Sequence, residues 1–240
     1  MALPMMSTPT YNLVIPSTGE KVRYRPFLVK EEKALLIAQQ SEETEVMVES
    51  LKQVIGGCVL DKINVDELAT FDIEYIFTQI RAKSVGEVVE LLFPCDEDHG
   101  EDQDKAKLKI SIDISKLEVE VPPGHSKKIE LFEDVGVIMK YPSFAVMGKM
   151  ENLDMSNVDN IFDIIASCID MIYQGEDLYY AKEQSKEELL EFLYNLTNEQ
   201  FLKLQAFFSK MPKISKTVEY NCPLCGKHHS VTLEGMQSFF

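Results

Sequence analysis

The 240-residue sequence predicts an α+β fold, in which a helical body carries several β-hairpins packed beside it. Short segments rich in β-branched residues occur in pairs around turn residues. The longer segments between them carry apolar residues every three to four positions. The composition, 45% hydrophobic and 27% charged, is that of a globular protein. We expect one compact unit built from residues 1–84, 85–142, 143–212 and 213–240.

The first segment predicts a hairpin followed by three helices. The expected elements are strands at residues 11–15 and 21–25, helices at residues 28–40 and 42–54, and a helix from residue 64 with Phe71, Tyr75, Ile76 and Ile80 as its apolar stripe. Thr18 and Gly19 supply the turn of the hairpin. Gly56 and Gly57 are expected to end the second helix, because glycine is the usual residue after a helix C-terminus. Asn64 is the expected N-cap of the third helix.

The middle of the chain predicts two more hairpins and a long helix. The expected elements are strands at residues 85–93 and 108–114, a hairpin at residues 129–139, and an amphipathic helix from residue 157 to about residue 173. Clean alternation of apolar and polar residues indicates the strand at residues 108–114. Isoleucines at helical spacing indicate the helix, which Asn157 begins.

Two capping boxes and a final hairpin close the chain. Ser185 with Glu188, and Thr197 with Gln200, each precede an apolar helical pattern and predict a helical hairpin. Strands are expected at residues 216–220 and 230–233. The chain ends on two phenylalanines, and we expect this apolar end to dock on the body of the protein rather than to insert into a partner.

The charge balance argues against a nucleic-acid ligand. The chain has 24 Lys and Arg against 40 Asp and Glu, a net charge of −16, and such a surface repels phosphate backbones. No apolar run approaches the ~20 residues of a membrane span, and residues 1–9 lack the basic start of a secretory signal. Five scattered cysteines do not make a secreted disulfide framework, which indicates a reducing cytoplasm. We expect Cys58 and Cys168 to be buried structural thiols.

The most informative motif is Cys222-Pro-Leu-Cys225-Gly226, which lies between the two final strands. Two cysteines two residues apart can turn both sulfurs toward one point. Gly226 allows a positive φ, so that backbone amides face the thiolates. This arrangement is half of a tetrahedral zinc site. The other two ligands must therefore come from a distant segment.

Cys95 and His99 are the expected second half. They lie four residues apart in a loop that follows a strand, and the loop's many acids lower the electrostatic cost of holding a dication. We predict a structural zinc ion held by Cys95, His99, Cys222 and Cys225, with the two hairpins paired into a zinc-ribbon-like module. His228 and His229 are rival fourth ligands. In the remaining alternative, no metal binds and the loop at Cys222 is only a tight turn held by backbone hydrogen bonds.

Other chemistries find little support in the sequence. No phosphate-binding loop, nucleophile elbow or metalloprotease helix motif is present. A redox Cys-x-x-Cys normally opens a helix, whereas Gly226 and a strand follow this one. His125 follows Pro-Pro-Gly and is expected to be a solvated loop residue. We therefore expect no catalytic residues, no small-molecule substrate and no enzymatic activity.

Three stretches resemble the T4-type bacteriophage baseplate protein family: residues 21–36, residues 139–143, and the closing Cys-Pro-Leu-Cys-Gly with residues 233–240. The resemblance covers residues 11–240. Members of the family are baseplate hub subunits or hub assembly catalysts and tend to carry two Cys-pair hairpins. This chain matches the second pair at Cys222 and Cys225. At the first pair only Cys95 matches, and His99 is the candidate replacement for the missing cysteine.

The resemblance implies a non-enzymatic interaction protein of tail assembly. Its partners would be other phage tail and baseplate proteins, met in the cytoplasm of the infected host. It would be either a subunit retained in the tail baseplate or an assembly catalyst absent from the virion. Two alternatives remain. One is a zinc enzyme with Cys95, Cys222, Cys225 and water as ligands and His99 as a proton shuttle. The other is a regulator whose ribbon binds a host protein.

Overall fold

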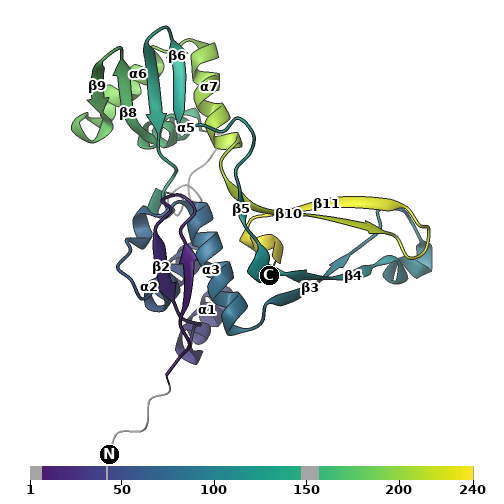
Figure 1. The fold of residues 1–240 in the computed structure, drawn as a ribbon. Helices are drawn as coiled ribbons and strands as arrows, with labels where there is room; N and C mark the ends of the chain where they lie inside the picture. Colours follow the sequence, from purple (N-terminus) through teal and green to yellow (C-terminus); the bar gives the residue numbers. More distant parts are fainter. Residues whose placement is uncertain (1–6, 42, 147–156, 240) are drawn as a thin grey trace, which may run out of the picture. The chain divides into compact units, whose positions relative to one another are not determined.

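A computed structural model describes residues 7–41, 43–146 and 157–239. Helices and small antiparallel sheets alternate along the chain, so the predicted α+β class is confirmed (Figure 1). The chain forms two compact units. The first contains Met1–Val65, Phe71–Glu120 and Lys213–Phe240, and the second contains Asp66–Thr70 and Val121–Pro212. No helix in the described ranges is long and apolar enough to cross a bilayer.

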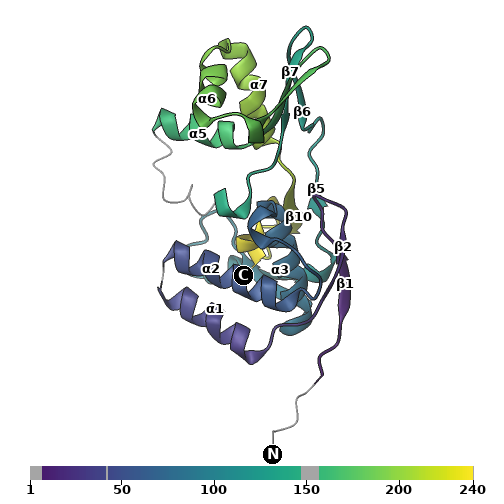
Figure 2. The same ribbon diagram turned by 90° about the vertical axis from the view of Figure 1, so that its left-hand side faces the viewer.

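The first unit begins with a hairpin and three helices. The elements are β1 (Tyr11–Val14), β2 (Lys21–Tyr24), α1 (Val29–Ser41), α2 (Thr44–Cys58) and α3 (Thr70–Ser84). The three helices lie side by side next to the hairpin (Figure 2). Ile55 of α2 and Ile76 and Ile80 of α3 are almost wholly buried, as is Ile15, which follows β1 in the hairpin. The predicted hairpin and the helix at residues 28–40 are confirmed.

The expected stop at Gly56-Gly57 is wrong, because α2 continues to Cys58. The amide of Val59 still donates to Ile55 O at 2.9 Å, so the helical pattern persists past both glycines. The absence of a side chain at Gly57 leaves room for the side chains of Arg25 and Glu31. Arg25 Nη2 donates to Gly57 O at 2.7 Å, and a Cβ on Gly57 would lie 3.5 Å from Glu31 Oε1.

Asn64 does not begin the third helix. The segment after it, Val65–Glu67, forms a single 3₁₀ turn, and α3 starts only at Thr70. Ala69 pairs with Ser143 in an isolated β-bridge, and the amide of Phe144 donates to Leu68 O at 2.9 Å. The bend at Leu68 and the β-bridge at Ala69 separate the 3₁₀ turn from the helix. Of the predicted apolar stripe, Phe71, Ile76 and Ile80 are buried and Tyr75 is half-buried. The buried part of α3 is wider than the stripe, since Ile73, Phe77 and Ala82 are buried as well.

Two long hairpins carry the predicted cysteine loops. They are formed by β3 (Val88–Phe93) with β4 (Leu108–Asp113), and by β10 (Lys213–Asn221) with β11 (His228–Glu234). A short strand, β5 (Val119–Glu120), pairs with the start of β10. The loops of both hairpins lie at the same end (Figure 1). Buried residues at alternating positions, such as Val218 and Tyr220, join one hydrophobic core with Val89, Phe93 and Ile112.

The C-terminal segment docks on this core, as expected. Gly235 has φ +69°, and Met236–Phe239 forms a 3₁₀ turn that returns the chain to the hairpins. The Phe239 side chain is 1% exposed and packs in the same cluster as Ile114 and Ile214. Phe240, the second half of this prediction, lies outside the described residues.

The second unit pairs a four-stranded antiparallel sheet with helices. Its elements are β6 (Lys128–Phe132), β7 (Val135–Met139), α5 (Val158–Ser167), β8 (Ile169–Gln174), β9 (Asp177–Tyr180), α6 (Lys186–Tyr194) and α7 (Asn198–Ser209). The strand order is β6-β7-β8-β9. Both capping boxes are confirmed: Ser185 Oγ accepts from the amide of Glu188 at 3.2 Å, and Thr197 Oγ1 accepts from the amide of Gln200 at 3.3 Å.

The predicted helix at residues 157–173 is only half right. Asn157 caps α5 as expected, accepting from the amide of Asp159 at 3.0 Å. The helix ends at Ser167, however, and the next residues form β8 between β7 and β9. The isoleucines that continue the helical spacing are also good strand formers. Gly175, with φ +58°, then provides the turn that returns the chain to β9.

His125 is not the solvated loop residue that the sequence suggests. Its ring stacks on Tyr141, with the ring centroids 5.6 Å apart, and also contacts Phe207 on α7. His125 Nε2 shares a hydrogen bond of 2.8 Å with the Tyr141 hydroxyl, while Nδ1 is buried and has no hydrogen-bond partner among the described residues. The aromatic neighbours come from elements distant in sequence, so local composition did not reveal them.

Candidate metal centre

The loop between β10 and β11 forms the tight turn that its sequence predicts. Cys222 donates its amide to Lys227 O at 2.8 Å, and Gly226 donates back to Cys222 O at 3.0 Å. Gly226 has φ +72°, a conformation that residues with a Cβ rarely adopt. The turn aims the amide of Leu224 at Cys222 Sγ, 3.4 Å away. Such N–H···S contacts stabilise a thiolate.

The loop between β3 and β4 repeats this contact. The amide of Glu97 points at Cys95 Sγ over 3.5 Å, so in both loops the second residue after a cysteine donates to its sulfur. Gln103 fixes the separation of Cys95 and His99. Its Oε1 accepts from the amide of His99 at 2.9 Å, and its Nε2 donates to Cys95 O at 3.2 Å. Nothing in the sequence marks Gln103 for this role.

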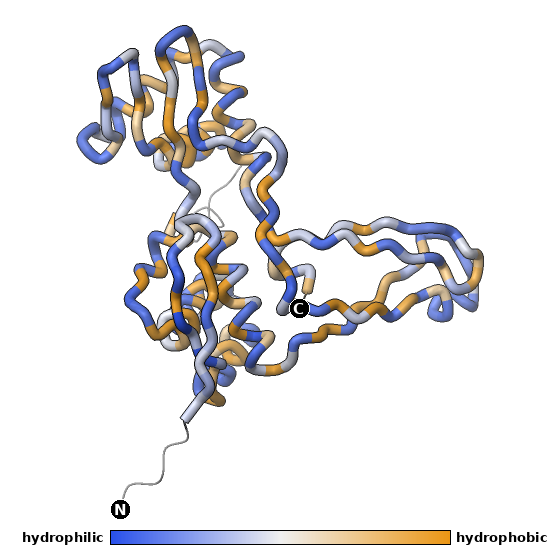
Figure 3. Tube along the Cα trace, viewed as in Figure 1, coloured by the Kyte–Doolittle hydropathy of each residue, from blue (hydrophilic) through white to orange (hydrophobic). Residues whose placement is uncertain are grey.

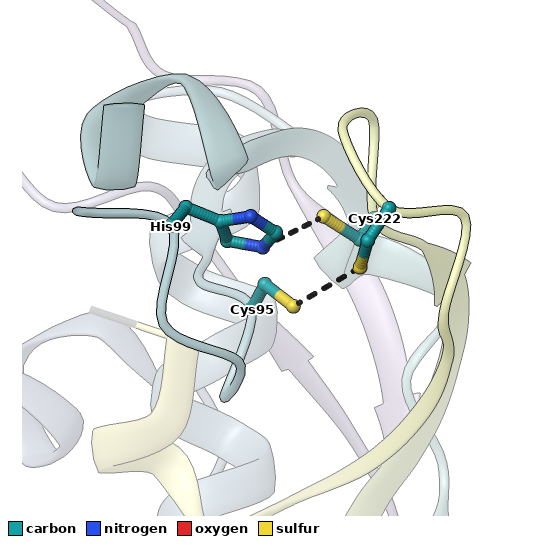
Figure 4. Close-up of side chains that lie close together, drawn as sticks. Cys95, His99 and Cys222 are labelled. Carbon is teal, nitrogen blue, oxygen red and sulfur yellow. Dashed lines mark hydrogen bonds between the residues drawn. The ribbon is translucent and has the colours of Figure 1, made fainter. Parts of the chain in front are cut away.

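The four predicted ligands meet where the two loops face each other. Cys95 Sγ lies 3.9 Å from Cys225 Sγ, and Cys222 Sγ lies 3.6 Å from His99 Nε2. Figure 4 shows Cys95 and His99 of the first loop directed toward Cys222 of the second. All four donor atoms lie within 4.8 Å of one another. Cys95 and Cys222 are buried, His99 is half-buried and Cys225 is exposed.

These separations fit a tetrahedral zinc ion. Zn–S bonds of about 2.3 Å and Zn–N bonds of about 2.0 Å at tetrahedral angles place two sulfurs about 3.8 Å apart, and a sulfur and a nitrogen about 3.5 Å apart. The corresponding distances here are 3.9 Å and 3.6 Å. A disulfide would require about 2.05 Å between the sulfurs. The donor set of three thiols and one imidazole therefore suits zinc in both chemistry and spacing.

The thiols differ in their readiness to bind a metal. Burial acts to raise the pKa of Cys222, but hydrogen bonds from the amides of Cys225 and Leu224 outweigh it and lower the pKa to about 6. For Cys95, burial dominates and raises the pKa to about 11. Because the thiolate is the metal ligand, the hydrogen bonds that lower the pKa of Cys222 favour its binding form.

Lys227 joins the two loops beside the thiols. Its Nζ lies 3.0 Å from Asp96 Oδ1 and 2.5 Å from Glu97 Oε1. The hydrogen bonds to Glu97 and Asp96 raise the pKa of Lys227, and Lys227 in turn lowers the pKa of Asp96. The acid-rich segment around them is coloured hydrophilic in Figure 3. Two of the loop acids thus bind a lysine of the opposite loop.

Packing beneath the loops holds their bases together. The Tyr220 hydroxyl on β10 donates to Pro94 O at 2.8 Å, and its ring lies 5.3 Å from the ring of Phe93 on β3. Ala106 is fully buried and packs against Cys95 and Cys222. These contacts place the cysteine loops opposite each other through protein interactions alone.

The rival histidines lie in different places. His228 Nδ1 shares a hydrogen bond of 3.1 Å with Asn221 Oδ1 and belongs to neither group of potential ligands. His229 stacks on Tyr220 and forms a second group with Cys95 and Asp96, at 3.6 Å from Asp96 Oδ1. His99 is the histidine that shares a group with all three candidate cysteines.

Comparison with known proteins agrees with the resemblance found in the sequence. The chain matches the family model of the T4 bacteriophage base plate protein over residues 8–240. No curated protein and no solved structure matched it. Because the match covers almost the whole chain, both compact units fall within the family model. This protein therefore belongs to the T4 bacteriophage base plate protein family.

Proposed function

We propose that this protein is a non-enzymatic component of the phage tail baseplate that acts in the hub through contacts with other phage structural proteins. The family match over residues 8–240 carries the proposal and supports a place in the tail of the virion. The alternation of hairpins and helical blocks agrees with it, because such a body offers several faces for binding.

A structural zinc ion is part of the proposal. Cys95, His99, Cys222 and Cys225 would hold the ion, and zinc would supply a rigid cross-link between the two loops. The contacts it would enforce join residues 123 and 130 positions apart in the sequence. Four protein donors leave no coordination position for water or substrate, which supports a structural role over a catalytic one.

Co-expression with the other hub and wedge proteins tests the assembly role. Size-exclusion chromatography should show the protein in a complex with at least one of them. Failure to associate with any tail protein would count against the proposal. Mass spectrometry of purified virions then distinguishes a subunit, which is retained, from an assembly catalyst, which is absent.

Elemental analysis of the purified protein tests the metal. We expect one zinc per chain, with an anomalous signal surrounded by four protein ligands. A zinc ion with three protein ligands and water would favour the alternative of a zinc enzyme. If the protein contains no zinc after purification in buffers that contain zinc, the two loops are hydrogen-bonded turns without a metal.

A further inference from the structure

An open pocket of about 230 Å³ lies between α7 and the start of β6 in the second unit. Figure 1 shows these two elements next to each other, and Lys203 on α7 donates to Leu131 O on β6 at 3.2 Å. The pocket is lined by Gly124, His125, Ser126, Lys128, Ile129, Lys203, Ala206, Phe207 and Lys210. This volume is below the about 300–1,000 Å³ of most small-molecule sites, and so suits one or two side chains better than a cofactor.

The charge of this pocket is opposite to that of the chain. Three of its nine lining residues are lysines and none is acidic, although the protein has 40 acidic residues against 24 basic ones. Ile129, Ala206 and Phe207 add an apolar wall beside the ammonium groups. The pocket therefore combines cations with an apolar surface.

Among the residues that the structure describes, no strong ion pair neutralises these lysines. Within the same set, Lys203 Nζ contacts backbone carbonyls alone, those of Glu130 at 3.4 Å and Leu131 at 3.2 Å. Lys128 has a long contact of 3.7 Å with Glu130 Oε1. Across the described ranges, Lys210 has no carboxylate within ion-pair distance, and its Nζ lies beside Gly124. The cations thus keep most of their capacity to bind an anion.

We propose that this pocket binds an acidic segment of a partner protein, with a carboxylate on the lysines and a neighbouring apolar side chain against Phe207 and Ile129. Charge complementarity selects the carboxylate, and the apolar wall favours a peptide over a free anion. That the segment comes from a partner rests on the proposed function. The preference for an anion rests on the lining residues alone.

Titration of the full chain with short peptides tests this inference. The probe is a capped tetrapeptide with two glutamates, each followed by a leucine, and the matched control carries glutamines instead. In amide NMR spectra, the acidic peptide should produce saturable shifts at residues 124–129 and 203–210. The shifts should weaken as salt rises, because salt screens exposed charges. The glutamine peptide should produce none.

Charge-removing variants locate the site. Lys210→Gln and Lys203→Gln should each weaken binding about two- to fivefold, the range for a partly exposed ion pair. Lys182→Gln removes an exposed lysine of the same unit outside the pocket and should leave binding unchanged. In the described part of the chain, the Lys210 side chain makes no hydrogen bond to the sheet, whereas Lys203 does. Lys210→Gln therefore reports on binding even if Lys203→Gln loosens the fold.

Three results would overturn the inference: equal binding of the glutamine peptide, shifts confined to other residues, or no effect of Lys210→Gln. Acetate and inorganic phosphate are titrated separately as free anions. If either binds as tightly as the peptide, the pocket is a site for free anions and the partner segment is wrong. Complex formation with tail proteins is measured independently, so a failed peptide titration leaves the proposed function standing.

Discussion

Replacing His99 with alanine should abolish high-affinity zinc binding. His99 supplies the single nitrogen of the candidate site, with Nε2 at 3.6 Å from Cys222 Sγ. Without it, three thiols and water remain. Loss of an outer-shell partner costs about 10- to 100-fold in metal affinity, and loss of a direct ligand should cost at least as much.

The expected effect on stability follows from linkage. Free zinc at 100 times its dissociation constant stabilises the folded state by about 2.7 kcal/mol. For a chain of this length, 1 kcal/mol shifts Tm by about 2–4 °C, so zinc should raise Tm by about 5–11 °C. Because the separations of the donor atoms already match a tetrahedron, little of the binding free energy of zinc is lost in rearranging the loops. A 100-fold weaker site would lose most of the increment at the same zinc concentration.

Two measurements check this prediction. Thermal unfolding with and without a chelator gives the zinc-dependent change in Tm for the wild type and for His99→Ala. Absorption of the cobalt-substituted protein reports the number of thiolates and a tetrahedral geometry. His228→Ala is the matched control, since His228 lies in neither ligand group and should leave both readouts unchanged.

Zinc binding by His99→Ala as tight as that of the wild type would exclude His99 as a ligand. If His228→Ala releases the metal instead, the ligand assignment is wrong. A wild-type Tm that does not respond to zinc or to the chelator would show that hydrogen bonds, Lys227 and the packing beneath the loops hold them without a metal.

Other substitutions test the fold around the site. Phe239→Ala should cost about 3–5 kcal/mol in chemical denaturation, because the 1% exposed ring fills the hairpin core; an unchanged midpoint would contradict docking of the C-terminal segment. Gly136→Ala should lower the free energy of unfolding by about 1–3 kcal/mol, because its Cβ would lie 2.6 Å from Ile129 O. Gly56→Ala should raise it by up to about 1 kcal/mol, because Gly56 lies inside α2 and the nearest atom to its Cβ would be 4.0 Å away. Burial opposes ionisation of Glu31, but hydrogen bonds from Arg25 and the Leu28 amide outweigh it and lower its pKa below 4.5. The stability from Glu31 is thus present above about pH 4.5 and lost as pH falls further, and Glu31→Gln should flatten this part of the stability–pH curve.

Local signals in the sequence were sufficient where neighbours along the chain make the decisive contacts. Both capping boxes close through side chains three residues from the backbone amides they bind, and both helices begin where predicted. The turn at Cys222 closes within five residues, with Gly226 at its positive φ. Such contacts depend on the identity of nearby residues, so a single sequence can reveal them.

The same signals failed where distant segments compete with local preference. Isoleucines at positions 169 and 172 fit a helix by spacing, but β7 and β9 on either side make them a strand. Gly56 and Gly57 usually mark a helix end, but α2 continues past them against the Arg25–Glu31 pair. The spacing of apolar residues along the sequence does not show which distant strand or side chain will pack against a segment.

The sequence by itself determined the chemistry of the candidate site. It contains the pair Cys222 and Cys225, it predicts a tight turn that directs both sulfurs toward one point, and it requires two further ligands from a distant segment. Tertiary structure decided which histidine joins the three cysteines and how Gln103 fixes the positions of Cys95 and His99. It also decided that three lysines line one pocket of a protein whose net charge is negative. The physical reason is that coordination and ion binding depend on distances between atoms. Between residues more than a hundred positions apart, those distances are set by the packing of the hairpins.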